Sequence, residues 1–220
     1  MTASARGLFR ATGATAKPQA VRLIDGTYTK VDTVEREVDD FYPTPPEPTA
    51  ALLDCEFWRL KDFETIWEPA CGDGAMARQI AGAGYGCLAT DLIDRGFGTP
   101  GVNFLETKEA LAPAIITNPP YHLCNERDGK GIWMWHALET LGIEYMALLL
   151  SWNWPVAGGH ARLWQTYQPA RAYLMRWKID FTGQGAPPML NGWFVWDRAH
   201  TGPCQLLMMD RTDVRQGGLI

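Results

Sequence analysis

The segment Ala114-Ile115-Ile116-Thr117-Asn118-Pro119-Pro120-Tyr121 decides which fold the sequence predicts. Its first four residues form a short apolar run that is typical of a buried strand. Proline has no backbone N–H and cannot continue a central strand, so the strand ends at Asn118. In an open α/β sheet, ligands bind beyond the carboxyl ends of the strands. We therefore expect residues 118–121 to border a binding site.

A glycine turn lies upstream, in Glu68-Pro69-Ala70-Cys71-Gly72-Asp73-Gly74. The apolar run 63–67 predicts the first strand, and residues 75–81 predict a helix that stops at Gly82 or Gly84. Gly72 and Gly74 have no Cβ, so the backbone can turn tightly and approach a ligand closely. The order strand, turn, helix favours a cofactor-binding turn.

A second strand, predicted at residues 87–90, ends at Asp91, about twenty residues after the glycine turn. A Rossmann-like sheet places a carboxylate there to accept hydrogen bonds from two ribose hydroxyls. A dinucleotide-dependent dehydrogenase would share this layout. It would also carry a third glycine in the pattern Gly-x-Gly-x-x-Gly, where this sequence has Ala77. The nicotinamide hypothesis is therefore disfavoured.

The stretch Phe41-Tyr42-Pro43-Thr44-Pro45-Pro46 precedes a helix that we expect to begin at Thr49. Its prolines fix φ and keep the preceding residues extended, so the stretch forms a rigid strap. Taken alone, such a strap is equally typical of a linker.

In this order, the strap, the glycine turn and Asn118-Pro119-Pro120-Tyr121 resemble the signature of class I S-adenosylmethionine-dependent DNA methyltransferases that act on the amine of adenine. More narrowly, the chain resembles the small adenine methyltransferases of phage and prophage genomes, over about residues 40–197. The resemblance implies a Rossmann-like α/β fold, a mixed seven-stranded sheet with helices on both faces. It implies one catalytic domain, residues 40–220, without a separate target-recognition domain. We expect residues 1–39 to be a partly disordered N-terminal extension in which Asp25-Gly26 turns a hairpin.

The resemblance implies S-adenosyl-L-methionine as the cofactor. The Thr44 hydroxyl or the backbone near it would bind the cofactor's carboxylate. Asn103 stands where the family usually has Asp, and its amide oxygen can still accept a hydrogen bond from the cofactor's adenine amine. The implied cofactor-binding residues are Tyr42, Thr44, Pro45, Glu68, Ala70, Gly72, Gly74, Asp91, Asn103, Phe104 and Asn118.

The implied catalytic residues are Asn118, Pro119, Pro120 and Tyr121. The exocyclic nitrogen of adenine is a poor nucleophile because its lone pair is delocalised into the ring. The Asn118 side-chain oxygen and the Pro119 carbonyl would accept its two hydrogens, localise the lone pair and aim it at the methyl group. The base must leave the duplex, and stacking on Tyr121 would recover roughly 1–3 kcal/mol.

Further substrate contacts are expected from Tyr121, from Arg127 and Lys130 in loop 122–131, and from Trp152 or Trp154 just after a strand at 145–150. The loop is either a phosphate clasp or an ordinary surface loop, and the tryptophans either line the pocket or fill the core. Residues 171–181 predict a strand, and residues 192–196 and 205–209 predict closing antiparallel strands.

Composition sets limits on partners. The net charge is −5, with 11 basic and 17 acidic residues through Tyr121 and 9 and 8 after it. The later half is the better candidate for contacting a polyanion, with weak or salt-sensitive affinity. The five cysteines show no metal-ligand spacing, so no metal is expected. With no signal peptide and no spanning segment, the expectation is a cytoplasmic protein without a membrane partner.

The sequence therefore predicts methyl transfer from S-adenosylmethionine to adenine N6 in DNA. Cytosine-N4 relatives typically carry Ser at the position of Asn118, which favours adenine. The alternatives are methylation of RNA or of a protein glutamine, and a catalytically silent cofactor-binding DNA protein. The Tyr-Pro-Thr-Pro strap and Glu68 favour the DNA enzyme over the glutamine and ribosomal enzymes that share Asn-Pro-Pro-Tyr.

Overall fold

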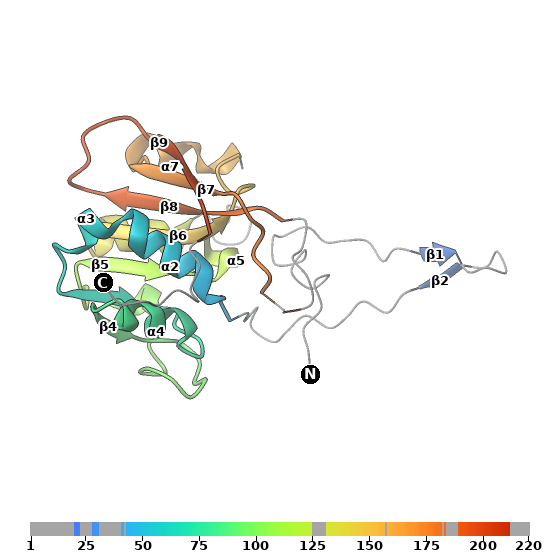
Figure 1. Cartoon of the computed structure of the whole chain (residues 1–220), viewed down its shortest axis with the longest axis horizontal. Helices are drawn as coiled ribbons and strands as arrows, with labels where there is room; N and C mark the ends of the chain where they lie inside the picture. The colour runs from blue at the N-terminus through green and yellow to red at the C-terminus, as the bar shows by residue number, and fades with distance from the viewer. Residues whose placement is uncertain are drawn as a thin grey trace.

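The computed structural model describes residues 20–22, 28–30, 41, 43–124, 131–156, 158–181, 183 and 189–211. Within these ranges the chain forms two sheets (Figure 1). The smaller sheet is the antiparallel pair of β1 (Ala20–Arg22) and β2 (Tyr28–Lys30), at the predicted hairpin. The larger sheet carries the candidate site.

The larger sheet has seven strands in the order β4-β3-β5-β6-β8-β7-β9. Six of these strands run parallel, and β8 is antiparallel to both of its neighbours. This confirms the predicted mixed seven-stranded sheet. The strands are β3 (Thr65–Glu68), β4 (Gly86–Ala89), β5 (Ala114–Thr117), β6 (Tyr145–Ser151), β7 (Arg171–Met175), β8 (Asn191–Asp197) and β9 (Gln205–Met209).

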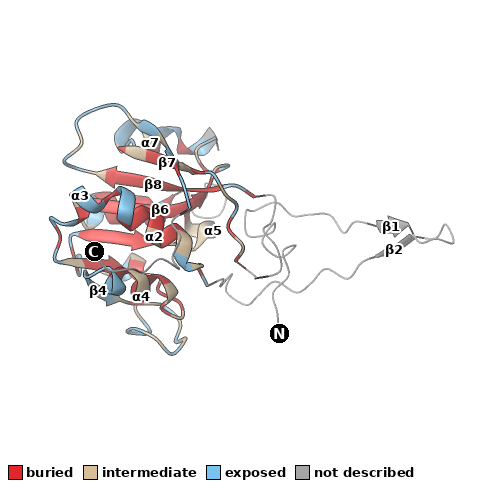
Figure 2. Cartoon of the chain, in the orientation of Figure 1, coloured by how far each residue is buried: buried red, intermediate tan, exposed pale blue. Residues whose placement is uncertain are grey.

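Alternating side chains of the central strands fill two separate hydrophobic cores. In β6, Tyr145, Ala147 and Leu149 face one core, while Met146, Leu148 and Leu150 face the other. Every residue of β6 is buried, as expected for a strand covered on both faces (Figure 2). The continuous apolar run 145–150 therefore lies in the middle strand of the sheet.

Helices cover both faces. The first core is closed by α2 (Pro46–Cys55), α3 (Phe57–Leu60) and α4 (Ala75–Gly82), with α2 and α4 in front of the sheet in Figure 1. The opposite face carries the 3₁₀-helix η2 (Phe104–Glu106), α5 (Tyr121–Cys124), α6 (Ile132–Trp135), the π-helix η3 (His136–Thr140), the 3₁₀-helix η4 (Gly158–His160) and α7 (Ala161–Thr166).

One predicted helix boundary, one predicted strand boundary and one predicted strand direction were wrong. The helix expected from Thr49 begins at Pro46, because proline is tolerated in the first turn, where its missing N–H has no partner to lose. The strand expected over 171–181 ends at Met175, because β8 begins at Asn191, opposite this end of β7. The last strand, 205–209, was expected to be antiparallel but pairs with β7 in parallel.

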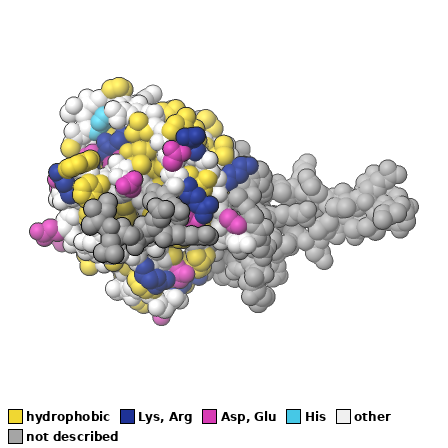
Figure 3. Space-filling view, viewed as in Figure 1, with side chains coloured by type: hydrophobic (Ala, Val, Ile, Leu, Met, Phe, Trp, Pro, Cys, Tyr) yellow, Lys and Arg dark blue, Asp and Glu magenta, His cyan; other side chains and the backbone are white. Residues whose placement is uncertain are grey.

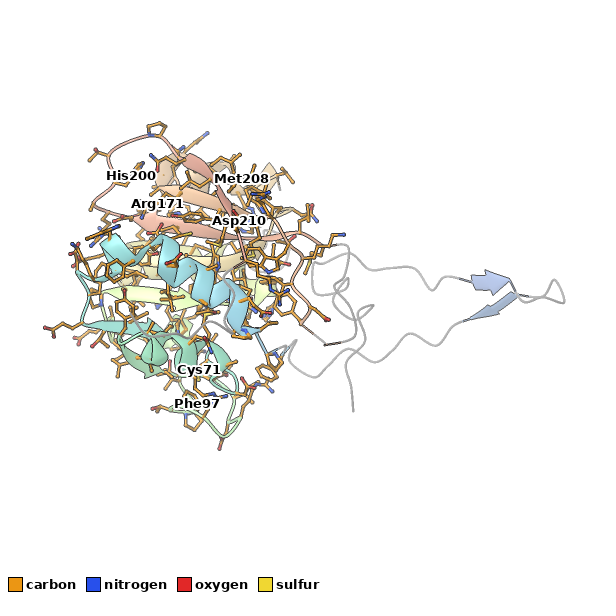
Figure 4. All side chains as sticks on the ribbon, in the orientation of Figure 1. Cys71, Phe97, Arg171, His200, Met208 and Asp210 are labelled. Carbon is orange, nitrogen blue, oxygen red and sulfur yellow. The ribbon has the colours of Figure 1, made fainter. Side chains whose placement is uncertain are left out.

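A buried ion network ties the first helices to the sheet. Arg171 of β7 donates to both carboxylate oxygens of Glu56, at 2.6 and 2.8 Å, and to Asp197 of β8 at 2.9 Å. The Tyr173 hydroxyl donates to Glu56 at 2.5 Å, and Arg59 donates to Asp197 at 3.0 Å. Figure 4 shows Arg171 between the front helices and the last strands. The network fixes the α2–α3 junction, and with it the segment that leads into α2.

Candidate active site

A cavity of about 350 Å³ lies at the carboxyl ends of β3, β4 and β5. It is the position predicted for ligands in an open α/β sheet. The cavity brings together residues of the strap, the glycine turn and the segment after β5, which are far apart in the chain. The predicted site residues that line it are Thr44, Glu68, Ala70, Asp91, Asn103, Phe104, Asn118, Pro119, Pro120 and Tyr121.

The glycine turn needs glycine for conformation and for packing. Gly72 and Gly74 have φ of 57° and 83°, in the left-handed region that side chains disfavour. A Cβ on Gly72 would overlap the Phe41 ring, and one on Gly74 would overlap the Phe97 ring. Figure 4 shows Phe97 beside Cys71 of this turn. The turn therefore packs beneath two aromatic rings, one before α2 and one after β4.

Asp91, just after β4, points its carboxylate back to the glycine turn. Oδ2 accepts a hydrogen bond of 2.7 Å from the backbone N–H of Gly72, and Oδ1 accepts one of 2.8 Å from that of Ile93. A carboxylate has about four acceptor positions, so both oxygens keep a lone pair for a ligand's hydroxyls. Asp91 is thus held in place and can still bind.

Asn103 makes local contacts with both ends of its carboxamide. Its oxygen accepts a 3.1 Å hydrogen bond from the N–H of Leu105 and caps η2, while its nitrogen donates to Glu106 at 2.8 Å. One lone pair of the oxygen is left for the predicted adenine contact. Next to it, Phe104 is buried and stacks on Trp133, with the ring centroids 4.1 Å apart. Trp133 lines the cavity but was not predicted, because an apolar helical residue carries no functional signal in the sequence.

Glu68, at the end of β3, is 2% exposed, and its Oε2 has no hydrogen-bond partner in the described part of the chain. Burial raises its pKa well above the ordinary value for Glu, and the nearby carboxylates Asp91 and Asp73 raise it further. Burial therefore disfavours the ionised form of Glu68, and the positive charge of the nearby Arg78 offsets this only in part.

Asn118, directly after β5, is oriented by the strap. Its Nδ2 donates a 3.1 Å hydrogen bond to Oγ1 of Thr44, which is 8% exposed. Its Oδ1 is buried and has no partner among the residues described. An unpaired buried acceptor is costly unless a ligand or a rearranged neighbour satisfies it, and Asn118 lines the cavity. Asn118 therefore presents an acceptor for which the described chain supplies no donor.

Tyr121 begins α5 and lines the same cavity. Asn191, the first residue of β8, donates from Nδ2 to the Tyr121 hydroxyl at 3.2 Å. Burial raises the pKa of Tyr121, so the hydroxyl stays neutral. Asn191 was not predicted, because it follows a Gly- and Pro-rich loop 70 residues later in the chain.

Several predicted residues lie away from the cavity lining or outside the described residues. Trp154 is in the core, where its indole N–H donates to the Cys124 carbonyl at 2.9 Å, and Trp152 packs on Phe194. Pro45 precedes the first residue of α2 and, like Gly72 and Gly74, is adjacent to lining residues. Tyr42, Arg127 and Lys130 lie outside the described residues.

Among the described residues, no group of three or more His, Cys, Asp or Glu side chains is placed to hold a metal ion. In the same part of the chain, each helix falls short of the length or apolarity that crossing a membrane requires.

The fold has clear counterparts among solved structures. The chain matches a protein of Pyrococcus horikoshii described as an inferred RNA methyltransferase, with 12% identity, a TM-score of 0.56, and coverage of 72% of this chain and 88% of that one. It also matches the modification subunit of an inferred type I restriction enzyme from Vibrio vulnificus, with 10% identity, a TM-score of 0.52, and coverage of 80% of this chain and 48% of that one. The chain has the class I methyltransferase fold.

At identities of 10–12%, these structural matches establish the fold alone. No protein-family model and no curated protein matches the sequence. The chemistry of the site must therefore be argued from its own residues.

Proposed function

We propose that this chain transfers a methyl group from S-adenosylmethionine to the N6 amine of adenine in DNA. The observation that carries the proposal is Asn118, a residue of the cavity lining whose buried Oδ1 has no partner among the described residues; Asp91 lines the same cavity. A carboxamide oxygen there would meet a donor such as an exocyclic amine. Asp91 would meet the ribose hydroxyls of the cofactor.

The cavity fits the proposed cofactor. A volume of about 350 Å³ is within the range of small-molecule sites. The carboxylate of Asp91 suits ribose hydroxyls, and the Phe104 ring suits a purine. Glu68, whose buried Oε2 has no partner in the described part of the chain, suits an ammonium group, which would favour the ionised form of Glu68. When bound, the cofactor would supply a methyl group on a sulfonium, an excellent leaving group.

The chain's own contribution is to hold and polarise the amine. Asn118 Oδ1 and the carbonyl of Pro119 would accept its two hydrogens, which localises the nitrogen lone pair. The ring of Pro119 fixes φ, and the following Pro120 restricts the ψ that sets the direction of that carbonyl. Tyr121, whose hydroxyl is held by Asn191, would stack on the extruded base. These residues supply orientation and electrostatic stabilisation, with no strong base.

DNA is preferred as the substrate because the three motifs, in their order, resemble the DNA enzymes and because Asn118 stands at the first catalytic position. The match to a restriction-modification subunit is consistent with this choice. On the face shown in Figure 3, Lys and Arg side chains lie among Asp and Glu, without one dominant basic patch over the described residues. We therefore expect modest, salt-sensitive DNA affinity.

RNA is the second candidate, since the other matched structure is described as an inferred RNA methyltransferase. Methylation of a protein glutamine would place a primary amide at the same pair of acceptors.

The deciding experiment offers S-adenosylmethionine with a labelled methyl group to three substrates: adenine-unmethylated genomic DNA, total RNA and a protein lysate. We expect label in DNA, recovered as N6-methyldeoxyadenosine after digestion. Asn118→Ala should abolish transfer while cofactor affinity stays within about twofold. Gln205→Ala, which removes an exposed carboxamide from β9, serves as the control and should transfer normally. Label confined to RNA or protein, or full activity of Asn118→Ala, would overturn the proposal.

A further inference from the structure

The strap before α2 and the segment after β5 are joined by one side-chain hydrogen bond, from Asn118 Nδ2 to Thr44 Oγ1. We propose that Thr44 is a positioning residue that determines which end of the Asn118 carboxamide faces the substrate amine. The inference rests on the proposed function, because it assumes that Asn118 accepts a hydrogen bond from that amine.

Thr44 is well suited to hold another side chain. It is 8% exposed, lines the cavity, and is followed by Pro45 and Pro46, which keep its backbone extended. A buried, β-branched side chain on a proline-stiffened backbone has few rotamers available. Asn118 comes from 74 residues further along the chain, so the bond exists only in the folded protein.

The bond matters because a carboxamide has two chemically opposite ends. A half-turn about its last torsion exchanges the acceptor Oδ1 with the donor Nδ2 at little steric cost. With Oδ1 toward the substrate, the amine's hydrogens meet an acceptor. With Nδ2 toward the substrate, two sets of donors face each other and the lone pair is not localised. The orientation seen here gives Nδ2 to Thr44 and leaves Oδ1 without a partner among the described residues.

A hydroxyl can donate as well as accept, so Thr44 enforces this orientation only while its own hydrogen is given to another acceptor. S-adenosylmethionine carries a carboxylate at its amino-acid end, and Thr44 lines the cavity proposed for it. A carboxylate that takes the Thr44 hydrogen leaves Oγ1 as an acceptor only. Occupation of the cofactor site would then orient Asn118 before the base arrives.

The test compares Thr44→Val, which keeps the shape, with Thr44→Ser, which keeps the hydroxyl. Each is made in the natural chain and in an Asn118→Asp background, where both side-chain oxygens are acceptors and a half-turn changes nothing. At saturating cofactor we expect Thr44→Val to lower kcat by roughly three- to tenfold in the natural chain. We expect Thr44→Ser to retain more of kcat than Thr44→Val, and Thr44→Val to cause a smaller loss of kcat in the Asn118→Asp background than in the natural chain.

Two binding measurements accompany the rates. Calorimetric titration with S-adenosylhomocysteine should show the same loss of affinity for Thr44→Val in both backgrounds, since that loss does not involve the carboxamide. In ¹H–¹⁵N spectra, the Asn118 side-chain NH₂ signal, identified by its absence in Asn118→Asp, should shift in Thr44→Val. It should also shift when S-adenosylhomocysteine is added to the natural chain.

Equal loss of kcat in both backgrounds, or no loss in either, would overturn the inference. These outcomes are distinct from failure of the proposed function, in which the natural chain would not methylate adenine in DNA. If the proposed function fails, the NMR measurement still tests the inference. An Asn118 NH₂ signal that shifts neither in Thr44→Val nor on addition of S-adenosylhomocysteine refutes positioning by Thr44.

Discussion

The backbone N–H of Gly72 and Oδ2 of Asp91 are joined by a hydrogen bond of 2.7 Å. This bond links the glycine turn after β3 to the acid after β4, so the two predicted cofactor-binding features form one unit. The same carboxylate also accepts from the Ile93 N–H at 2.8 Å. The orientation of the Asp91 carboxylate is therefore set by two backbone N–H groups and does not depend on the position of another side chain.

Asp91→Asn should weaken the binding of S-adenosylhomocysteine at least tenfold, because one of the two charged acceptors becomes an amide donor. Calorimetric titration measures this. Asp94→Asn is a matched control, since Asp94 also accepts a hydrogen bond from the N–H two residues ahead but is exposed and outside the cavity lining. Equal losses in the two variants would remove Asp91 from the binding site.

Tyr121 should tolerate loss of its hydroxyl better than loss of its ring. Tyr121→Phe removes the 3.2 Å bond from Asn191 but keeps a stacking surface, so kcat/KM should fall about two- to tenfold. Tyr121→Ala also removes the stacking energy, roughly 1–3 kcal/mol, so its kcat/KM should be lower than that of Tyr121→Phe by the corresponding factor. Steady-state methyl transfer to DNA measures both. Identical activities for the two variants would contradict a stacking role.

The buried carboxyl of Glu68 predicts a pH dependence of stability. Burial raises its pKa in the folded state, so between the ordinary pKa of Glu and this raised value the folded state binds more protons than the unfolded state. The free energy of unfolding should therefore decrease as the pH rises through that window. Glu68→Gln should show a smaller decrease, and at the upper end of this pH window it should be more stable than the natural chain.

Urea denaturation at several pH values measures the effect of Glu68→Gln. Glu109→Gln, which removes an exposed carboxyl, is the control and should keep the pH dependence of the natural chain. A Glu68→Gln variant with the same pH dependence as the natural chain would show that Glu68 ionises freely in the folded state.

Arg171 should be needed for stability far more than Arg176. Arg171→Met leaves the buried carboxylates of Glu56 and Asp197 without their shared partner, at a cost of about 3–5 kcal/mol. Arg176 pairs with Asp210 on the surface, where both side chains are more than half exposed, so Arg176→Met should cost at most about 1 kcal/mol. Chemical denaturation of both variants gives the comparison, and equal costs would contradict the role of the network.

The Asp197 carboxylate in this network should also make the protein acid-sensitive. Burial raises its pKa, but hydrogen bonds from Arg171 and Arg59 outweigh burial and hold it below the ordinary value. Its contribution to stability is present above the unfolded pKa and is lost as the pH falls through the lowered one. Unfolding measured between pH 5 and pH 2 should show a shallower loss in Asp197→Asn than in the natural chain.

Local patterns were sufficient for the central strands and for the glycine turn that follows β3. The apolar runs of β3, β5 and β6 are short, bounded by Gly, Pro or polar residues, and buried on both faces. Such runs are recognisable because a parallel sheet needs apolar side chains in both directions. Gly72 and Gly74 were recognisable because their backbone conformation excludes most other residues.

Local patterns were insufficient at the end of the chain and for the tryptophans. The direction of β9 depends on the path of the connection from β8, which periodicity does not encode. Trp154 follows a strand that ends near the site, yet its ring lies in the core and its N–H is satisfied by Cys124. Sequence position could not separate a pocket wall from core filling.

The sequence by itself determined the central strands and the glycine turn, because these depend on the φ, ψ or burial preferences of neighbouring residues, and its three motifs indicated the groups of the proposed site by resemblance. Only the tertiary structure decided how those groups are held. Thr44 reaches Asn118, Asn191 reaches Tyr121, and Arg171 reaches Glu56 across 70 to 115 residues of chain. Contacts at such separations form when strands take their places in the sheet, and no local preference specifies them.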